Sequence, residues 1–214
     1  MNRIKYPRTY HLPWSLGATD DDKVLNDCTQ FEGRRVIVTK KMDGENTTFY
    51  PDGYVHARSL DSQGGIDRDW VKAFAQKVCY SLPEGWRVCG ENLWAKHSIH
   101  YEDLPSYFLC FGIWDNTNRC LRWDDIVVWC SLLGIERVPV LFDGIWDEKA
   151  IRSLEKNMDF SRDEGYVVRF AGEFKYEDFK SSVAKFVRPN HVQTDKHWRS
   201  SSLTPNALTN QDDL

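Results

Sequence analysis

A lysine at the end of an apolar, strand-like run is the residue of this 214-residue chain best suited to covalent chemistry. Lys41 opens a turn that contains Asp43 and Gly44. A lysine amine can attack a phosphorus atom once its proton is removed and a nucleotide is held in line. Because a free lysine has a pKa of about 10.4, we expect the cations Lys40 and Lys185 to lower the pKa of Lys41.

Carboxylates occur where they could serve the same chemistry. Glu164 precedes a strand-like run, and we expect it to bind a divalent cation, since magnesium favours a carboxylate together with water and phosphate oxygens. Glu91 follows another apolar run and is a candidate ligand for a ribose hydroxyl or a metal, with a salt bridge as the alternative. Asp43 could orient the lysine or hold a ribose hydroxyl, or could simply form an Asp-Gly turn in which Gly44 permits close backbone approach.

Other side chains are candidates for contacts with a nucleotide. Lys185 is placed to contact an α-phosphate, and Arg188, on the same strand, could serve the nucleotide or a nucleic-acid backbone. Arg58 could clamp a phosphate with its guanidinium fork, and Asn46 could bind a sugar or a base. Phe111 could stack on a purine, a contact worth about 1–3 kcal/mol. For each of these side chains the alternative is an ordinary exposed or core position without a ligand contact.

Metal sites other than Glu164 and Glu91 find little support. His191 and His197 match no common metal-site spacing, and surface or phosphate contacts are preferred for them. The acidic run 20–22 is interpreted as an exposed charged segment. The six cysteines include no Cys-x-x-Cys pair, which argues against a structural zinc site. They are interpreted as reduced core thiols of a cytoplasmic protein.

Composition limits the class of protein. The chain has 28 basic and 32 acidic residues and a net charge of −4, which argues against a protein that coats polyanions in general. A local cationic groove would still suffice for a nucleic-acid enzyme. No stretch reaches the roughly 18 apolar residues that a membrane span requires.

The order of the expected elements predicts the fold. Strands are expected at 35–39, 46–50, 54–58, 86–91, 107–114, 165–170 and 183–188, and helices at 67–80, 124–133 and 147–157. This order lacks a regular βαβ alternation and favours an α+β fold built on antiparallel sheets with flanking helices. We expect one domain over residues 1–199, with residues 1–30 as an N-terminal arm and residues 200–214 as a flexible tail.

Taken together, these segments resemble the covalent nucleotidyltransferases. Lys41-x-Asp43-Gly44, Arg58, Glu91, the 108–111 strand, Glu164-Gly165 and Lys185 occur in the order that this superfamily shows. Asn46 and the Phe-x-x-Phe strand are similar to the RNA ligase branch, in particular to ligases like phage RNA ligase 2, rather than to DNA ligases or capping enzymes. The resemblance covers about residues 30–190.

The resemblance implies an ATP-grasp-like nucleotidyltransferase domain that uses ATP and Mg²⁺ or Mn²⁺. Lys41 would take AMP from ATP, AMP would pass to an RNA 5′-phosphate, and an RNA 3′-hydroxyl would displace it and seal the strand. The family's nucleotide site is lined by the residues matching Arg58, Glu91, Phe111, Glu164 and Lys185. With the candidates above, the predicted nucleotide site also includes Lys40, Asp43, Gly44, Asn46 and Arg188, and the predicted metal ligand is Glu164.

The chain departs from the family pattern at two places. The last motif is often Lys-x-Lys, whereas this chain has Lys185 followed by Arg188, so that Arg188 takes a lysine's role or the role is absent. Lys40 precedes the nucleophile where relatives often carry glutamate. The alternatives are a DNA ligase, another nucleotidyltransferase with the same lysine intermediate, or an inactive module that binds nucleotide or RNA.

Overall fold

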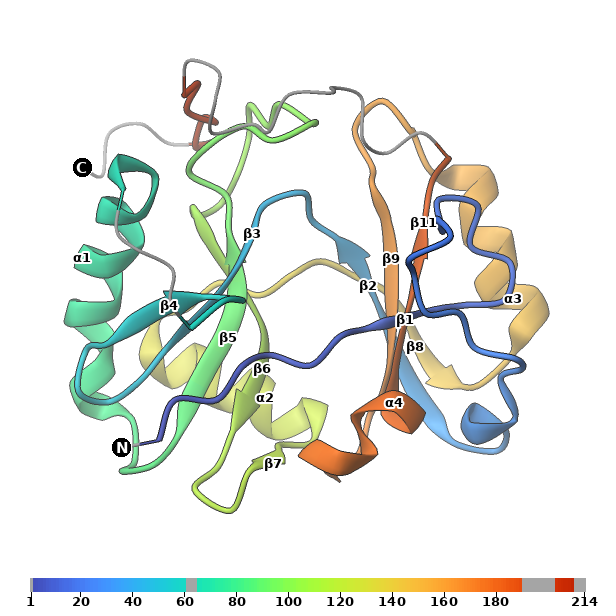
Figure 1. Cartoon of the computed structure of the whole chain (residues 1–214), viewed down its shortest axis with the longest axis horizontal. Coiled ribbons are helices and arrows are strands. Elements are labelled where there is room, and N and C mark those ends of the chain that lie inside the picture. Colours follow the sequence, from blue (N-terminus) through green and yellow to red (C-terminus); the bar gives the residue numbers. More distant parts are fainter. Residues whose placement is uncertain (1, 61–64, 190–202, 210–214) are drawn as a thin grey trace.

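Two β-sheets stand opposite each other in the computed structural model (Figure 1), which describes residues 2–60, 65–189 and 203–209. The first sheet has five strands in the order β1 (Tyr10–His11), β11 (Val183–Val187), β9 (Gly165–Phe170), β2 (Arg35–Lys41) and β8 (Val140–Ile145). The second has six in the order β10 (Phe174–Lys175), β7 (Arg119–Cys120), β6 (Phe108–Trp114), β5 (Arg87–Asn92), β3 (Glu45–Phe49) and β4 (Val55–Ala57). The prediction of a mixed α and β fold on antiparallel sheets is confirmed, although β1 pairs with β11 in parallel.

Few helices cover the sheets. The α-helices are α1 (Asp69–Val78), α2 (Trp123–Leu133), α3 (Glu148–Ser153) and α4 (Phe179–Ser182). Short 3-10 turns are η1 (Thr29–Phe31), η2 (Ile66–Arg68), η3 (Cys79–Ser81), η4 (Leu154–Asn157) and η5 (Tyr176–Asp178). None of these helices is long and apolar enough to cross a bilayer.

Local signals explain where two helices begin or end. Gly134 adopts a left-handed conformation with φ of 64° and ends α2 as predicted, because a glycine carries no Cβ to clash there. The Asp147 carboxylate accepts a hydrogen bond from Ala150 N at 3.0 Å and caps α3. The helix predicted over 147–157 is shorter, since the α-helix stops at Ser153 and continues as 3-10 turn.

The strand β2 separates two hydrophobic clusters. Val36 and Val38 are fully buried in a cluster with Phe31 and Ile151, on the α3 side of the first sheet. Ile37 points the other way, into a larger cluster between the two sheets. Alternating side chains on an extended strand produce this division, and it directs one face of β2 toward the second sheet.

The strands that the sequence did not reveal depend on distant partners. β8 is an edge strand, and Val140, Leu141 and Ile145 on it are exposed, so burial does not impose an alternating pattern on it. The strands β1, β7 and β10 contain two residues each. Such short strands form because a neighbour offers backbone groups, which a local pattern does not record.

The N-terminal arm crosses from the second sheet to the first (Figure 1). The Arg3 guanidinium forms an ion pair with Asp52 at 2.5 Å, and Ile4 N donates to the Tyr50 hydroxyl at 2.9 Å. Farther along, the Tyr176 hydroxyl donates to Lys5 O at 2.7 Å. The arm then joins the first sheet as β1, so both of its ends are fixed.

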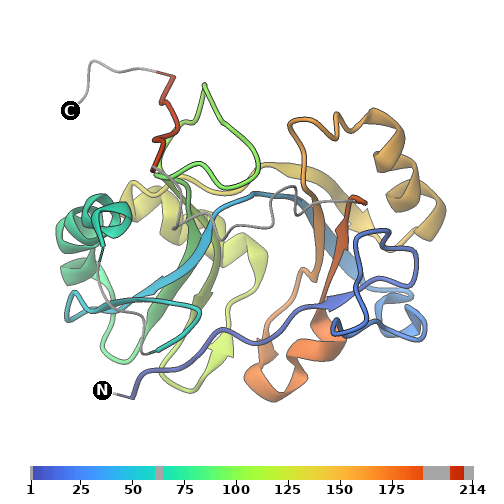
Figure 2. The ribbon, with the colours of Figure 1, turned by 45° about the horizontal axis from the view of Figure 1, so that its top comes forward.

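The C-terminal residues 203–209 lie beside the long loop between β5 and β6 (Figure 2). The sequence placed them in a flexible tail, but backbone hydrogen bonds such as Asn206 N to Trp94 O at 2.9 Å hold them in place. Residues 190–202 and 210–214, and with them His191 and His197, lie outside the described residues.

Candidate active site

The register of the first sheet gathers polar side chains on the face that looks toward the second sheet. Lys41 of β2 pairs with Gly165 of β9, and Val167 of β9 pairs with Lys185 of β11. Because side chains alternate along a strand, Lys41 and Lys185 emerge on the same face as Val167. A cavity of about 870 Å³ opens on this face, and all three residues line it.

Most of the predicted site residues line this cavity. They come from both sheets and from the segments between strands, and they are Lys40, Lys41, Asn46, Arg58, Glu91, Phe111 and Lys185. Asp43, Gly44, Glu164 and Arg188 are not part of the lining. The structure therefore brings together residues that are up to 145 positions apart in the sequence, as from Lys40 to Lys185.

Lys41 is paired with a carboxylate. Its Nζ donates to Glu164 Oε2, and the Glu164 side chain is almost fully buried. Burial acts to lower the pKa of Lys41, but the attraction of Glu164, Glu91 and Asp43 outweighs it, so the pKa lies above its ordinary value. The expectation that neighbouring cations lower this pKa is thus wrong for the structure described here.

Lys40 has a different partner, which sequence reasoning did not identify. Its Nζ forms an ion pair with Asp163 at 2.5 Å, directly beside the pair of Lys41 and Glu164. Two consecutive lysines on β2 thus meet two consecutive carboxylates before β9. This arrangement holds Lys40 at the cavity wall and neutralises part of its charge.

Two further cations at the cavity, Lys185 and Arg58, are available to bind an anion. Burial and the repulsion of Lys41 lower the pKa of Lys185. Arg58 is exposed and lines the cavity. In the part of the chain that the structure describes, neither Lys185 nor Arg58 forms an ion pair, so both can meet a phosphate.

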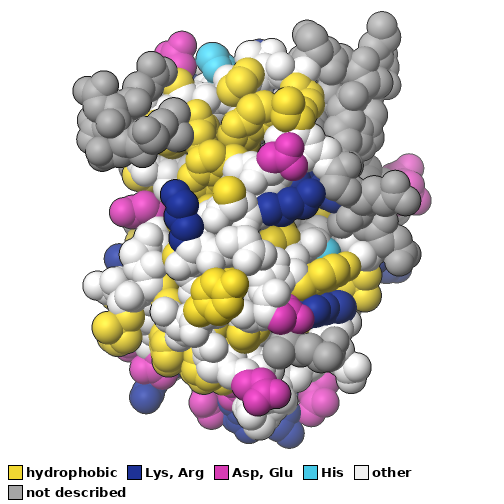
Figure 3. Space-filling model, turned by 90° about the vertical axis from the view of Figure 1, so that its left-hand side faces the viewer, with side chains coloured by type: hydrophobic (Ala, Val, Ile, Leu, Met, Phe, Trp, Pro, Cys, Tyr) yellow, Lys and Arg dark blue, Asp and Glu magenta, His cyan; other side chains and the backbone are white. Residues whose placement is uncertain are grey.

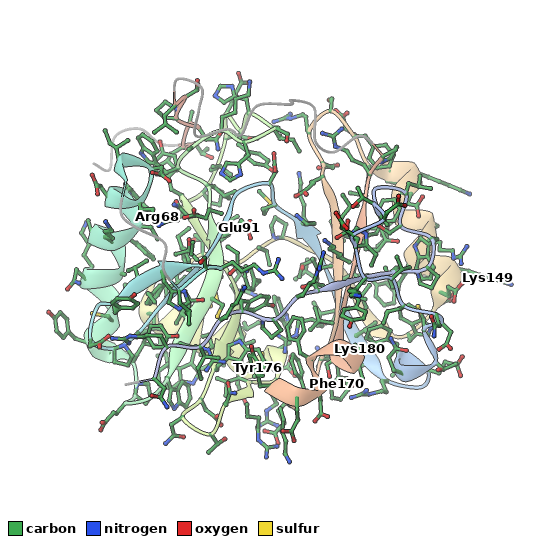
Figure 4. All side chains as sticks on the ribbon, viewed as in Figure 1. Arg68, Glu91, Lys149, Phe170, Tyr176 and Lys180 are labelled. Carbon is green, nitrogen blue, oxygen red and sulfur yellow. The ribbon has the colours of Figure 1, made fainter. Side chains whose placement is uncertain are left out.

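Asn46 and Glu91 lie opposite each other on β3 and β5, at the wall formed by the second sheet. Figure 4 shows Glu91 on the side of β5 that faces the first sheet. Asn46 Oδ1 is buried and has no hydrogen-bond partner among the described residues. Burial raises the pKa of Glu91 to about 8, against the opposing attraction of Lys41. Buried polar atoms are normally satisfied, so a ligand with a donor group fits this wall.

Another wall of the cavity is aromatic. Phe111 is half-buried, and Tyr6 of the N-terminal arm packs edge-on against it with 5.1 Å between the ring centroids. Arg169 donates to Leu121 O at 2.9 Å and lies with Tyr6 and Phe111 in the lining. Tyr6 was not predicted as a site residue, because it lies 29 positions before Arg35, where the first predicted strand begins.

The Asp43 carboxylate is already engaged with the protein backbone. Its Oδ2 accepts hydrogen bonds from Ser98 N and Ile99 N, both at 2.7 Å, and its own N–H donates to the Tyr101 hydroxyl at 3.0 Å. In this structure Asp43 therefore holds the loop between β5 and β6 against the Lys41 turn rather than facing the cavity.

Gly44 is required by close approach. A Cβ at this position would lie 2.5 Å from Asn92 O and 2.7 Å from Leu93 Cδ2. The close backbone approach predicted for Gly44 is thus an approach to the end of β5 within the protein. Any larger residue would push the Lys41 turn away from β5.

Arg188 stands apart from the cavity lining. The residue is buried, its N–H donates to Glu164 O at 2.9 Å, and its Nε has no partner among the described residues. The contact with Glu164 fixes the backbone beside the Lys41 partner. A direct role of Arg188 at a nucleotide remains a prediction.

The donor set near Lys41 fits a cation that arrives with phosphate. No group of three or more His, Cys, Asp or Glu side chains is arranged to bind a metal ion within residues 2–60, 65–189 and 203–209. A single carboxylate such as Glu164 fits Mg²⁺, which keeps several waters and takes phosphate oxygens as further ligands. It does not fit a metal held in a cage of protein ligands.

Comparison with known proteins identifies the family. A family model described as RNA ligase matches residues 34–187. The chain belongs to the RNA ligase family. The matched range contains Lys41, Glu91, Phe111, Glu164 and Lys185. No curated protein matches this RNA ligase family member in sequence.

Solved structures share the fold at low sequence identity. An archaeal ATP-dependent RNA ligase matches with a TM-score of 0.59 and 15% identity, over 86% of this chain and 48% of that chain. Naegleria gruberi RNA ligase with PPi matches with a TM-score of 0.57 and 22% identity, over 88% and 61%. A mutant of the Naegleria ligase with ATP and Mn gives 0.53 and 17%, over 85% and 58%. This RNA ligase family member thus spans only about half to three fifths of the length of these relatives.

Proposed function

We propose that this chain is an ATP-dependent RNA ligase that joins RNA 3′-hydroxyl and 5′-phosphate ends through a lysyl-AMP intermediate on Lys41. The observation that carries the proposal is the position of Lys41, which lines a cavity of about 870 Å³ together with an aromatic ring and with two cations that form no ion pair among the described residues. This volume lies within the range typical of small-molecule sites. The two sheets around the cavity would form one ATP-grasp-like nucleotidyltransferase domain.

The nucleotide would use both walls of the cavity. Phe111 would stack on adenine, and Asn46 and Glu91 would bind donor groups of the ribose or base, which supplies the missing partner of Asn46 Oδ1. Lys185 and Arg58 would bind the phosphates, because neither is neutralised by an ion pair among the described residues. Lys40 would add charge nearby, weakened by Asp163.

The amine must lose its proton before it attacks. Glu164 is the direct hydrogen-bond partner of Lys41 and is therefore the group placed to hold that proton. The same carboxylate is the proposed ligand of Mg²⁺ or Mn²⁺, a cation that would neutralise charge on the phosphates. Lys185 would stabilise charge that develops on the α-phosphate as the Lys41–phosphorus bond forms and pyrophosphate leaves.

The later steps would return Lys41 to its free state. An RNA 5′-phosphate oxygen attacks the phosphorus of lysyl-AMP, and the amine leaves and regains a proton. An RNA 3′-hydroxyl then attacks the activated 5′-phosphate and AMP departs. The six cysteines are all buried and free, which supports a reducing, cytoplasmic location for this chemistry.

The test is covalent labelling. Incubation with α-labelled ATP and Mg²⁺, followed by denaturation, should leave label on the wild-type chain and none on Lys41→Ala. Lys149→Ala is the matched control, since Lys149 lies on α3, far from the cavity (Figure 4). Absence of label on the wild type with every ribonucleoside triphosphate would reject the lysyl-nucleotide mechanism and favour a binding module.

A second assay separates the substrate classes. Ligation of nicked duplexes, broken stem-loops and free ends should succeed with RNA at the 3′-hydroxyl side. Equal activity with DNA ends would instead indicate a DNA ligase with the same intermediate. Glu164→Ala should retain the fold but lose metal-dependent labelling, and normal labelling in that variant would remove Glu164 from the site.

A further inference from the structure

The C-terminal segment Leu203–Thr209 forms a second layer of contacts around the active site. It runs beside the loop between β5 and β6, residues 93–107, with bridges that pair Ala95 with Pro205 and Leu104 with Leu208. Figures 1 and 2 both show this segment next to the loop. None of its residues lines the cavity, so any influence on chemistry must pass through the loop.

Asn206 is the centre of these contacts. It is 3% exposed, its Nδ2 donates to Leu93 O at 2.7 Å, and its Oδ1 accepts from Tyr101 N at 2.9 Å. Its backbone N–H donates to Trp94 O at 2.9 Å, and its carbonyl accepts from the Tyr107 hydroxyl at 3.0 Å. A buried amide with both polar groups satisfied fixes the backbone that it binds.

The loop fixed by Asn206 is the loop that holds the Lys41 turn. Tyr101 meets Asn206 through its backbone N–H and meets Asp43 through its hydroxyl, which accepts from Asp43 N at 3.0 Å. The Asp43 carboxylate in turn accepts from Ser98 N and Ile99 N, both at 2.7 Å. Asp43 is two residues from Lys41, so the contacts run from Asn206 to the nucleophile without interruption.

We propose that Leu203–Thr209 is a latch that positions Lys41, with Asn206 and Tyr101 as positioning residues for adenylyl transfer. In a loosened turn the amine would lie off the line of attack on the α-phosphorus. A displacement of about 1 Å at a reacting group costs on the order of 10²-fold in rate. The ATP-binding walls, which come from other segments, would be unaffected.

The test uses full-length point variants. Asn206→Ala should lower the rate of single-turnover self-adenylylation at saturating ATP by on the order of 10²-fold, with the apparent ATP affinity within about twofold. Tyr101→Phe keeps the ring and removes only the hydroxyl, so it should lower the same rate. Because both act through one contact chain, the double variant should be no slower than the slower single variant.

A matched control lies away from the latch and the cavity. Ser153, at the end of α3, donates to Ala150 O at 2.6 Å, so Ser153→Ala should keep the wild-type rate. An unchanged rate in a folded Tyr101→Phe variant would overturn the proposal, and this holds even where Asn206→Ala does not fold. A loss in ATP affinity equal to the loss in rate would also overturn it.

The proposal rests on the function proposed above, and hydrogen exchange separates the two. The amides of Asp43, Ser98 and Ile99 should exchange faster in Asn206→Ala than in the wild type, without ATP or RNA present. Faster exchange without any self-adenylylation of the wild type would retain the latch and reject the ligase. Unchanged exchange at these amides would reject the latch alone.

Discussion

The buried ion pair between Glu45 and Arg68 gives the sharpest test of how the fold supports the site. Arg68 Nε donates to Glu45 Oε1 at 2.7 Å, and Nη2 donates to Oε2 at 2.6 Å. The Arg68 side chain is only 4% exposed and the Glu45 side chain only 13%. The pair ties η2, on the α1 side of the molecule (Figure 4), to the start of β3 just after the Lys41 turn.

Arg68→Met removes one charge and leaves the Glu45 carboxylate buried without that guanidinium. Breaking one side of such a pair costs about 3–5 kcal/mol of unfolding free energy, because the remaining charge stays desolvated. For a chain of this size about 1 kcal/mol moves the melting temperature by roughly 2–4 °C, so a fall of about 6–20 °C is expected. Urea denaturation of wild type and variant measures the free-energy difference directly.

Arg35→Met is the control, because Arg35 also makes paired hydrogen bonds, to Asp124 and Asp143, but at the surface. Its side chain is 41% exposed and its partners are 61% and 43% exposed, so the variant should lose no more than about 1 kcal/mol per pair. Figure 3 shows a face of the molecule on which cations and carboxylates are likewise scattered at the surface. A loss in Arg68→Met below about 1 kcal/mol, or one equal to that in Arg35→Met, would refute the reasoning.

Further predictions address single features of the site. Gly165 has φ of 156°, and a Cβ added there would lie 2.0 Å from Phe186 O. Gly165→Ala should therefore lower the unfolding free energy, measured in urea, by more than about 3 kcal/mol. A smaller loss would show that β9 and β11 can separate to make room for the methyl group. The pKa of Glu91 is raised from about 4.5 to about 8, so the folded state holds a proton there that the unfolded state releases. The stability that this bound proton contributes is present below about pH 4.5 and is lost as the pH rises through about 8. In the metal-free protein, Glu91→Gln should therefore reduce the dependence of the unfolding free energy on pH across that interval. An unchanged dependence on pH would contradict this. Lys185→Met should lower the rate of lysyl-AMP formation by on the order of 10²-fold while the urea midpoint stays close to wild type, and a rate near wild type would remove Lys185 from the phosphate site.

Local sequence patterns were sufficient for residues within or next to apolar strands. Lys41, Glu91 and Glu164 lie at or beside the end of such a run, and Lys185 lies in the middle of one, so their approximate positions follow from periodicity and turn residues. Antiparallel pairing then places Lys41 opposite Gly165, next to Glu164. These features are local, or depend on one pairing rule.

Contacts between distant segments were not predictable in the same way. Asp163 meets Lys40, Tyr6 meets Phe111, and Asn206 meets Tyr101 only after the chain has folded. Each partner is polar or aromatic in a segment without periodicity, so nothing local marks it. The pKa of Lys41 is equally hidden from local patterns, because Glu164, Glu91 and Asp43 from separate segments outweigh the effect of its burial.

Asp43 shows that a motif residue can also hold the fold together. An aspartate two positions after the motif lysine suggests a ligand contact, yet its carboxylate binds two backbone amides of the loop between β5 and β6. A loop without secondary structure cannot satisfy all its amides internally, and a buried carboxylate is a strong acceptor for them. The sequence shows the aspartate but not the loop that returns to it.

The arm that crosses the cavity bears on how the protein should be expressed. Lys5, Tyr6, Pro7, Arg8 and Thr9 all contribute to the wall of the cavity. A shortened version that begins at the first long strand would therefore open one side of the cavity to solvent. Deletions chosen to help crystallisation should therefore leave the first ten residues in place.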